Sequence, residues 1–214
     1  MNTVLFLILY PVIVALLLLI LPQLAIRKFI VGASTAILTV ASIYLMIDYF
    51  NTGAVFFEFG THTLNLGILF IEVALAAIIV YISVKHKQFL AALLMLTGAI
   101  MTIWFEVTHG NQIHATHNLF VDNLSLIMTL IIGIIGGLIA LFAVGYMEEY
   151  HKHHPNVKNR VPFFFFIVFA FLGAMYGLVF ANNLMWLFFF WEITTFCSFF
   201  LIGYSRDEIA IKNA

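Results

Sequence analysis

Glu192 is the residue whose type and surroundings most clearly suggest chemistry. It stands in the segment FFFWEITTFCSFF, among phenylalanines and with no lysine or arginine nearby. An acidic residue at the centre of a membrane-spanning helix costs about 3 kcal/mol on insertion-based scales. Burial favours the neutral carboxyl and an approaching cation favours the carboxylate, so such a group can take up and release a proton. We therefore predict that Glu192 is a proton-relay group; the alternative is a structural hydrogen bond to another helix.

Three further polar residues could support such a relay. Thr195 and Ser198 follow Glu192 at helical spacing, so they could extend a polar track or hold a water molecule. Glu72 lies about 9 Å inside the predicted helix 66–84 by helical rise. It is either an outer relay group or a glutamate that contacts another helix or reaches the membrane interface.

Other residues of interest have structural interpretations. In FVDNLSLIM, Asp122 or Asn123 is a reasonable N-cap, and an acidic residue suits the start of a helix. Gly133 and Gly137 have the GxxxG spacing that permits close packing of membrane helices.

The sequence predicts neither a metal site nor a cofactor site. Histidines occur in HATH (His114 and His117) and in HKHH (151–154), but we interpret both groups as solvated loop residues. The single cysteine, Cys197, excludes an intramolecular disulfide or a multi-cysteine metal site. No nucleotide-binding motif and no nucleophile–base pair at membrane depth is present, so an intramembrane hydrolase is poorly supported.

The elements that position these residues must be membrane helices. The chain is 64% apolar and 9% charged, with a mean hydropathy of +1.11. A soluble domain has about 25% charged residues, so this chain could not cover a folded surface with polar groups. The formal net charge of −1 gives no reason to expect nucleic-acid binding. We predict an integral, multi-pass protein in the lipid bilayer, most plausibly of a prokaryotic cytoplasmic membrane.

Seven segments are apolar and long enough to be considered spans, and lipid requires each to be helical. The fold class is thus all-α, a polytopic helix bundle in a single membrane domain over residues 1–214, with the first four helices and outer loops in 1–119. The fourth segment is the shortest, and a tilted or re-entrant helix is an alternative there. The predicted segments are Thr3–Leu21, Phe29–Tyr49, Leu66–Val84, Phe89–Phe105, Leu124–Met147, Pro162–Phe180 and Asn183–Tyr204.

The distribution of basic residues predicts the orientation. With the N-terminus outside and one crossing per helix, all nine lysines and arginines fall on the inner side. Such asymmetry follows the positive-inside rule and would be lost if one helix were wrongly assigned. The C-terminus is then inside. Because every basic residue lies at the inner rim, a cation that pairs with Glu192 at membrane depth must come from outside this sequence.

Two connections carry structural predictions. The segment NTGAVFFEFGTHTLN is rich in aromatic and β-branched residues and could form a small extramembrane hairpin. The turn at Ala181 and Asn182 is very short, so the last two helices should be antiparallel neighbours.

The last part of the chain resembles a known family. LFVDNLSLIMTLIIGIIGGLIALFAVGYM and FFFFIVFAFLGAMYGLVFANNLMWLFFFWEITTFCSFFLIGY are similar to antiporter-like membrane subunits, a superfamily that includes the large proton-pumping subunits of complex I, Mrp-type sodium/proton antiporter subunits and membrane-bound hydrogenase subunits. The resemblance covers Phe120–Ala214, the start of the antiporter-like repeat. It implies that Glu192 pairs with a lysine on a later helix, in a fold of about fourteen helices with two inverted repeats.

The chain departs from that pattern in two ways. It ends at RDEIAIKNA, before the helix that would carry the lysine, so we expect a fragment, a split-gene product or a truncated subunit completed by a partner. The segment Leu66–Phe105 also adds two helices before the family's usual third helix.

The resemblance implies a proton- or sodium-translocating subunit of a multisubunit oxidoreductase complex, associated with other membrane subunits, one of which supplies the lysine. A hydrogenase-type subunit is the preferred interpretation, and complex I and Mrp types stay open. A non-transporting scaffold subunit is the alternative function. The chain itself shows no redox centre, so whether it is part of an enzyme is left open.

Overall fold

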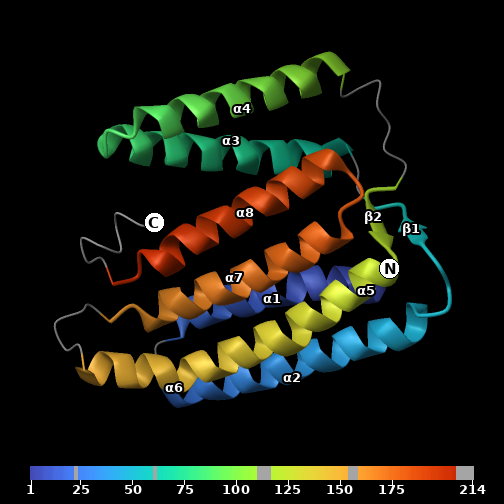
Figure 1. Ribbon diagram of the computed structural model, residues 1–214, viewed down its shortest axis with the longest axis vertical. Coiled ribbons are helices and arrows are strands. Elements are labelled where there is room, and N and C mark those ends of the chain that lie inside the picture. The colour runs from blue at the N-terminus through green and yellow to red at the C-terminus, as the bar shows by residue number, and fades with distance from the viewer. Residues whose placement is uncertain (22–23, 60–61, 110–116, 154–158, 206–214) are drawn as a thin grey trace. The chain divides into compact units, whose positions relative to one another are not determined.

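The computed structural model describes residues 1–21, 24–59, 62–109, 117–153 and 159–205. These residues are mostly helical, as Figure 1 shows. Helices α5, η1 and α6 follow one another without a break, so the described residues form seven helical rods, and the predicted all-α class is confirmed. The elements are α1 (Asn2–Ile20), α2 (Leu24–Tyr49), β1 (Val55–Phe57), α3 (His62–Lys85), α4 (Phe89–His109), β2 (Leu119–Val121), α5 (Asn123–Leu130), η1 (Ile131–Gly136), α6 (Gly137–His153), α7 (Val161–Phe180) and α8 (Leu184–Ile202).

Six of the rods are long and apolar enough to cross a membrane. The seventh, within α4, contains the shorter apolar stretch Phe89–Phe105, the segment predicted to be the shortest. The protein is thus a multi-pass membrane protein. Its helices present many large apolar side chains on their outer faces, as a bundle surrounded by lipid requires.

Four helices, α2, α3, α4 and α6, are several residues longer than the hydropathy pattern predicted. Helix α2 begins at Leu24 rather than at Phe29, and α6 continues to His153 rather than ending at Met147. The turn added to α2 contains Arg27 and Lys28, and the residues added to α6 are mostly polar, which is why a hydropathy criterion leaves these turns out. They are joined by an ion pair between Lys28 Nζ and Glu148 Oε1 at 2.6 Å.

The contacts divide the chain into two compact units, which we describe separately. The first comprises Met1–Phe57 and Leu119–Ala214, and so contains α1, α2 and α5 to α8. The second comprises Glu58–Asn118, in which α3 and α4 form an antiparallel helical hairpin. The turn of this hairpin contains Lys87 in the left-handed region, with φ of 60°.

The predicted local hairpin after α2 is wrong. Strand β1 does form where aromatic residues were noted, but its partner is the distant β2, in antiparallel register with Phe56 opposite Phe120. A further bridge joins Leu119 to Ala181 between α7 and α8. The backbone of the loop thus finds its hydrogen bonds in the segment that enters α5, and this pairing ties together the ends of three rods.

Close helix packing in the first unit depends on glycines of α7. A Cβ on Gly173 would lie 3.1 Å from the carbonyl oxygen of Ile8 in α1. A Cβ on Gly177 would overlap the ring of Phe190 in α8. Near the other end of the pair, the ring centroids of Phe164 and Tyr204 are 5.5 Å apart. Helices α7 and α8 are therefore antiparallel neighbours, as the short turn between them predicted.

The ends of the helices in the first unit separate into two groups. At one end, the Met1 amino group donates to Tyr49 Oη over 3.3 Å. At the other end, Lys28 meets Glu148, and His151 Nε2 lies 3.0 Å from Tyr204 Oη. The rods therefore alternate in direction as the orientation argument requires, and the basic residues that the structure describes in this unit lie at one end.

Candidate functional site

Glu192 lies near the middle of α8 and is only 8% exposed. It is eight residues from Leu184 and ten from Ile202, which places it about 12 Å and 15 Å from the two ends by helical rise. It is the one charged residue in the sequence of α8. Asn183 caps the helix, its Oδ1 accepting from the Met185 amide over 3.0 Å. A single carboxyl is thus held at depth on an otherwise apolar, regular helix.

The hydroxyls predicted to extend a polar track turn back onto their own helix. Thr195 Oγ1 donates to the carbonyl of Trp191 over 3.1 Å, and Ser198 Oγ donates to the carbonyl of Thr194 over 2.8 Å. Thr195 is also exposed on the outer face of α8. These bonds engage the hydroxyl protons locally, and a role in a track with Glu192 stays a prediction.

Glu72 lies deeper than the sequence indicated. Helix α3 begins at His62, four residues before the predicted start at Leu66. Glu72 is thus ten residues from that start, or about 15 Å by helical rise. The residue is 4% exposed. Glu72 is therefore an acidic residue near the middle of α3, and its role as an outer relay group, a helix contact or a glutamate that reaches the membrane interface stays a prediction.

Asp122 and the two glycines of the fifth rod occupy structural positions. Asp122 is the N-cap of α5: its Oδ1 accepts from the Ser125 amide over 2.7 Å, and Ser125 Oγ accepts from the Asp122 amide over 2.7 Å. A Cβ on Gly137 would lie 2.7 Å from Thr35 Cγ2 in α2. A Cβ on Gly133 would overlap Ser42, also in α2. Both glycines therefore permit close contact between α2 and the fifth rod.

A buried polar seam crosses this contact, and sequence reasoning missed it. Ser42 Oγ lies 3.0 Å from Tyr176 Oη of α7, and Thr39 Oγ1 donates to the Gly133 carbonyl over 3.0 Å. Gly133 belongs to η1, a π-helical turn, and such turns redirect backbone groups within a helix. One turn earlier, Thr129 is fully buried, and its hydroxyl has no hydrogen-bond partner among the described residues. These residues are uncharged and distant in sequence, so the sequence does not predict that they meet. The one feature they share in the sequence is a hydroxyl group within an apolar segment.

We expect Ser42 and Tyr176 to stabilise the bundle jointly. Their bond is buried and joins α2 to α7. Replacing both Ser42 with alanine and Tyr176 with phenylalanine should cost less than the sum of the single replacements, with a coupling of about 0.6–1.7 kcal/mol. Thermal or denaturant unfolding of the four proteins in detergent would measure this coupling, and additive losses would show that the bond contributes nothing.

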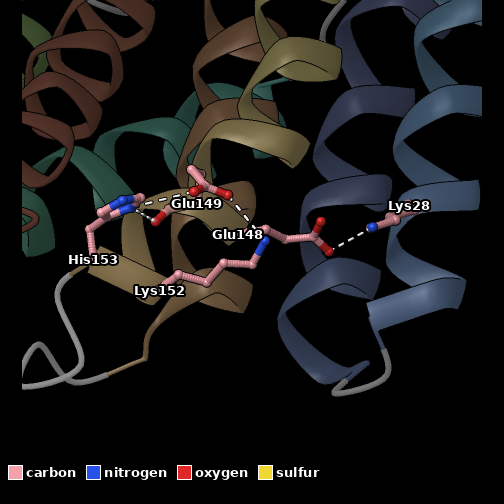
Figure 2. A network of polar contacts seen from close by, with 5 residues as sticks. All are labelled: Lys28, Glu148, Glu149, Lys152 and His153. Atoms are coloured by element: carbon pink, nitrogen blue, oxygen red, sulfur yellow. Dashed lines mark hydrogen bonds and ion pairs between the residues drawn. The ribbon is translucent and has the colours of Figure 1, made fainter.

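Charged residues form a network at the basic end of α2 and α6 (Figure 2). Besides the Lys28–Glu148 pair, Glu149 Oε2 accepts from Lys152 Nζ over 3.1 Å, and Glu149 Oε1 lies 3.5 Å from His153 Nδ1. The pairs around Glu149 are largely exposed and so contribute little to stability.

The histidines described by the structure do not gather into a metal centre. In the described part of the chain, no three histidine, cysteine, aspartate or glutamate residues come together as ligands. His151 bonds with Tyr204, whose pKa is raised by burial, so that its hydroxyl stays protonated. His114 and His154 lie outside the described residues.

Comparison with known proteins decides which family these helices resemble. Residues 104–156 match the family described as the N-terminus of NADH-ubiquinone oxidoreductase (complex I) chain 5. This segment includes Asp122, the π-helical turn and both close-packing glycines. The chain is homologous, in part, to antiporter-type membrane subunits. The antiporter-type segment so defined ends before Glu192.

Named relatives of this antiporter type are sodium/proton antiporter subunits. The chain is 36% identical over 93 residues to the Na(+)/H(+) antiporter subunit A1 of Staphylococcus haemolyticus (strain JCSC1435), which is 44% of this chain and 11% of that protein. It is 36% identical over 121 residues to the subunit A1 of Staphylococcus aureus (strain bovine RF122 / ET3-1), or 52% of this chain and 14% of that protein. The matched part of the chain thus spans about a seventh or less of these relatives.

These comparisons favour one of the types left open by the sequence. The relatives carry the name of a sodium/proton antiporter subunit, and the matched family is that of a complex I chain. The preference for a hydrogenase-type subunit receives no support from them. The alternative, an Mrp-type antiporter subunit, is better supported.

Proposed function

We propose that this chain is a membrane segment of a cation/proton-translocating subunit of the Mrp antiporter type, assembled with other membrane subunits. The observation that carries this proposal is the similarity of the chain to relatives named as Na(+)/H(+) antiporter subunits. The multi-pass architecture supports it. Translocation of protons in exchange for sodium ions is the activity that these observations favour.

Glu192 is the relay group in this proposal. Its carboxyl lies about midway along α8 and is nearly buried, so neutral and charged forms differ strongly in their interaction with the surroundings. An approaching sodium ion or a cationic side chain stabilises the carboxylate and releases the proton, and its departure favours protonation again. The carboxyl therefore alternates between two states as cations come and go, which is the step that couples cation movement to proton movement.

A cation at the depth of Glu192 completes this relay. The resemblance noted in the sequence suggests a lysine, and we assign it to helices outside this chain. In the first unit, the lysines and arginines of the described residues lie near the starts of α2 and α7 and the end of α6. These described residues lie near helix ends, whereas Glu192 lies near the middle of α8, and a partner subunit or a further part of the same subunit supplies the lysine in this proposal.

Inside-out membrane vesicles containing the complete complex would test the proposed activity. After a pH gradient is established by respiration, sodium chloride should collapse the gradient, as followed with a pH-sensitive fluorescent dye. Vesicles from cells that lack this chain provide the control. The proposal would be contradicted if sodium chloride left the pH gradient unchanged in both preparations.

The complex I match favours a second candidate, a proton-pumping subunit of an oxidoreductase. The same vesicles discriminate between the two. A pH gradient that forms with an electron donor only when this chain is present, and that sodium leaves intact, would support the oxidoreductase assignment.

A further inference from the structure

A cavity opens at the basic end of the first unit, where the starts of α2 and α7 meet the end of α6. Its volume is about 190 Å³, several times what one ordered water requires, which is about 15 Å³. Val161 and Phe165 contribute an apolar wall, while Arg27, Lys28 and Glu148 contribute charged groups. The cavity is thus amphipathic and larger than a hydration site.

The described residues that line this cavity include two basic residues and one acidic residue. Arg27 and Lys28 come from the start of α2, and Glu148 comes from α6. Figure 2 shows Lys28 reaching across from α2 to Glu148 on α6. Lys28 Nζ and Glu148 Oε1 are 2.6 Å apart. Arg27 is only 5% exposed, and its Nη2 donates to the Leu21 carbonyl over 3.0 Å.

We propose that this cavity binds the phosphate group of an anionic phospholipid from the inner leaflet. Arg27 and Lys28 are the donors, and a guanidinium suits phosphate because its N–H groups match two oxygens. The N-termini of α2 and α7 open onto the same cavity and add their positive helix ends. This site is separate from the residues assigned to ion translocation and does not depend on that assignment.

Two features favour a lipid over a free phosphate ion. The apolar wall formed by Val161 and Phe165 suits glycerol and the first acyl carbons, for which an inorganic ion has no use. The cavity also lies at the basic end, which the distribution of lysines and arginines predicts to be cytoplasmic, and basic pockets between helices on that side suit anionic headgroups.

Lipid retention by the purified full chain would test the site. In nanodiscs or micelles with equal phosphatidylglycerol and phosphatidylcholine, native mass spectrometry should show preferential retention of phosphatidylglycerol. The variants Arg27→Gln and Lys28→Gln should each lower that retention about fivefold or more. Lys152→Gln removes a similar rim charge that is exposed and paired with Glu149, so it should change retention little.

A variant that is expected to raise lipid retention makes the test independent of whether Arg27→Gln folds. Glu148→Gln removes the carboxylate that holds Lys28, so phosphatidylglycerol retention should rise. The proposal is overturned if Lys28→Gln and Glu148→Gln both leave retention unchanged, or if Lys152→Gln lowers it as much as Lys28→Gln does. Binding of inorganic phosphate without preferential lipid retention would also overturn it, because the site would then be one for a free anion.

Discussion

Replacing Glu192 with glutamine is expected to lower sodium-dependent proton movement at least about tenfold, because a positioned proton-transfer group contributes about 10²–10⁴ in rate. Glutamine keeps nearly the same shape and can hydrogen-bond, but it cannot alternate between neutral and charged forms. The buried position of Glu192 in the middle of α8 makes its titration the feature that the variant removes. The measurement is the sodium-induced collapse of the pH gradient in inside-out vesicles that contain the complete complex.

A matched control is Glu149→Gln, which makes the same chemical change at an exposed position paired with Lys152. It should leave transport close to normal. Immunoblots of the membranes would establish that both variants assemble to the same level. If Glu192→Gln assembles and transports normally, Glu192 is a structural residue and the scaffold function gains support. A proportionate loss of assembly and transport would likewise assign it a structural role.

Replacing Gly133 with alanine is expected to destabilise the protein by about 1–3 kcal/mol, the usual cost of overpacking. The added methyl group would overlap Ser42 and would lie 2.9 Å from Tyr176 Oη, so the buried bond between these two side chains would have to break or move. Gly133 is also in the π-helical turn, where the backbone is held against α2 by the bond from Thr39. The thermal unfolding midpoint in detergent, followed by fluorescence-detected size exclusion, would measure the loss.

Gly145 provides the matched control for that prediction. It lies in α6, and an added Cβ there meets nothing within 4 Å. Gly145→Ala should therefore keep or slightly raise the unfolding midpoint, since alanine is favoured over glycine in a helix. Equal midpoints for the two variants would show that contact between α2 and η1 is not limiting for stability.

The existence, number and type of the helices follow from the sequence alone. Lipid cannot satisfy free backbone groups, so a long apolar run such as Thr3–Leu21 has only one stable form, and the structure places α1 there. The alternating directions of the helices in the first unit are likewise predictable, because basic residues are retained on the inner side of the membrane. The cost of burying a carboxyl singled out Glu192 without any knowledge of its neighbours.

Helix ends were less predictable because polar turns beyond the membrane have no hydropathy signal. The early start of α3, which moves Glu72 deeper, and the extension of α6 are both of this kind. The pairing of β1 with β2 was also missed. Three residues of extended backbone do not specify a partner, and the partner lies across two helices in the sequence.

The sequence by itself thus determined seven membrane helices and an acidic residue buried in α8. The reason is that the length of an apolar segment and the cost of a charge within it depend on that segment alone. Only the tertiary structure decided which polar groups meet. Ser42 bonds to Tyr176, and Arg27 and Lys28 line one cavity with Glu148. Such meetings depend on how close two helices approach, and that distance is set by glycines and side-chain shapes on both helices at once.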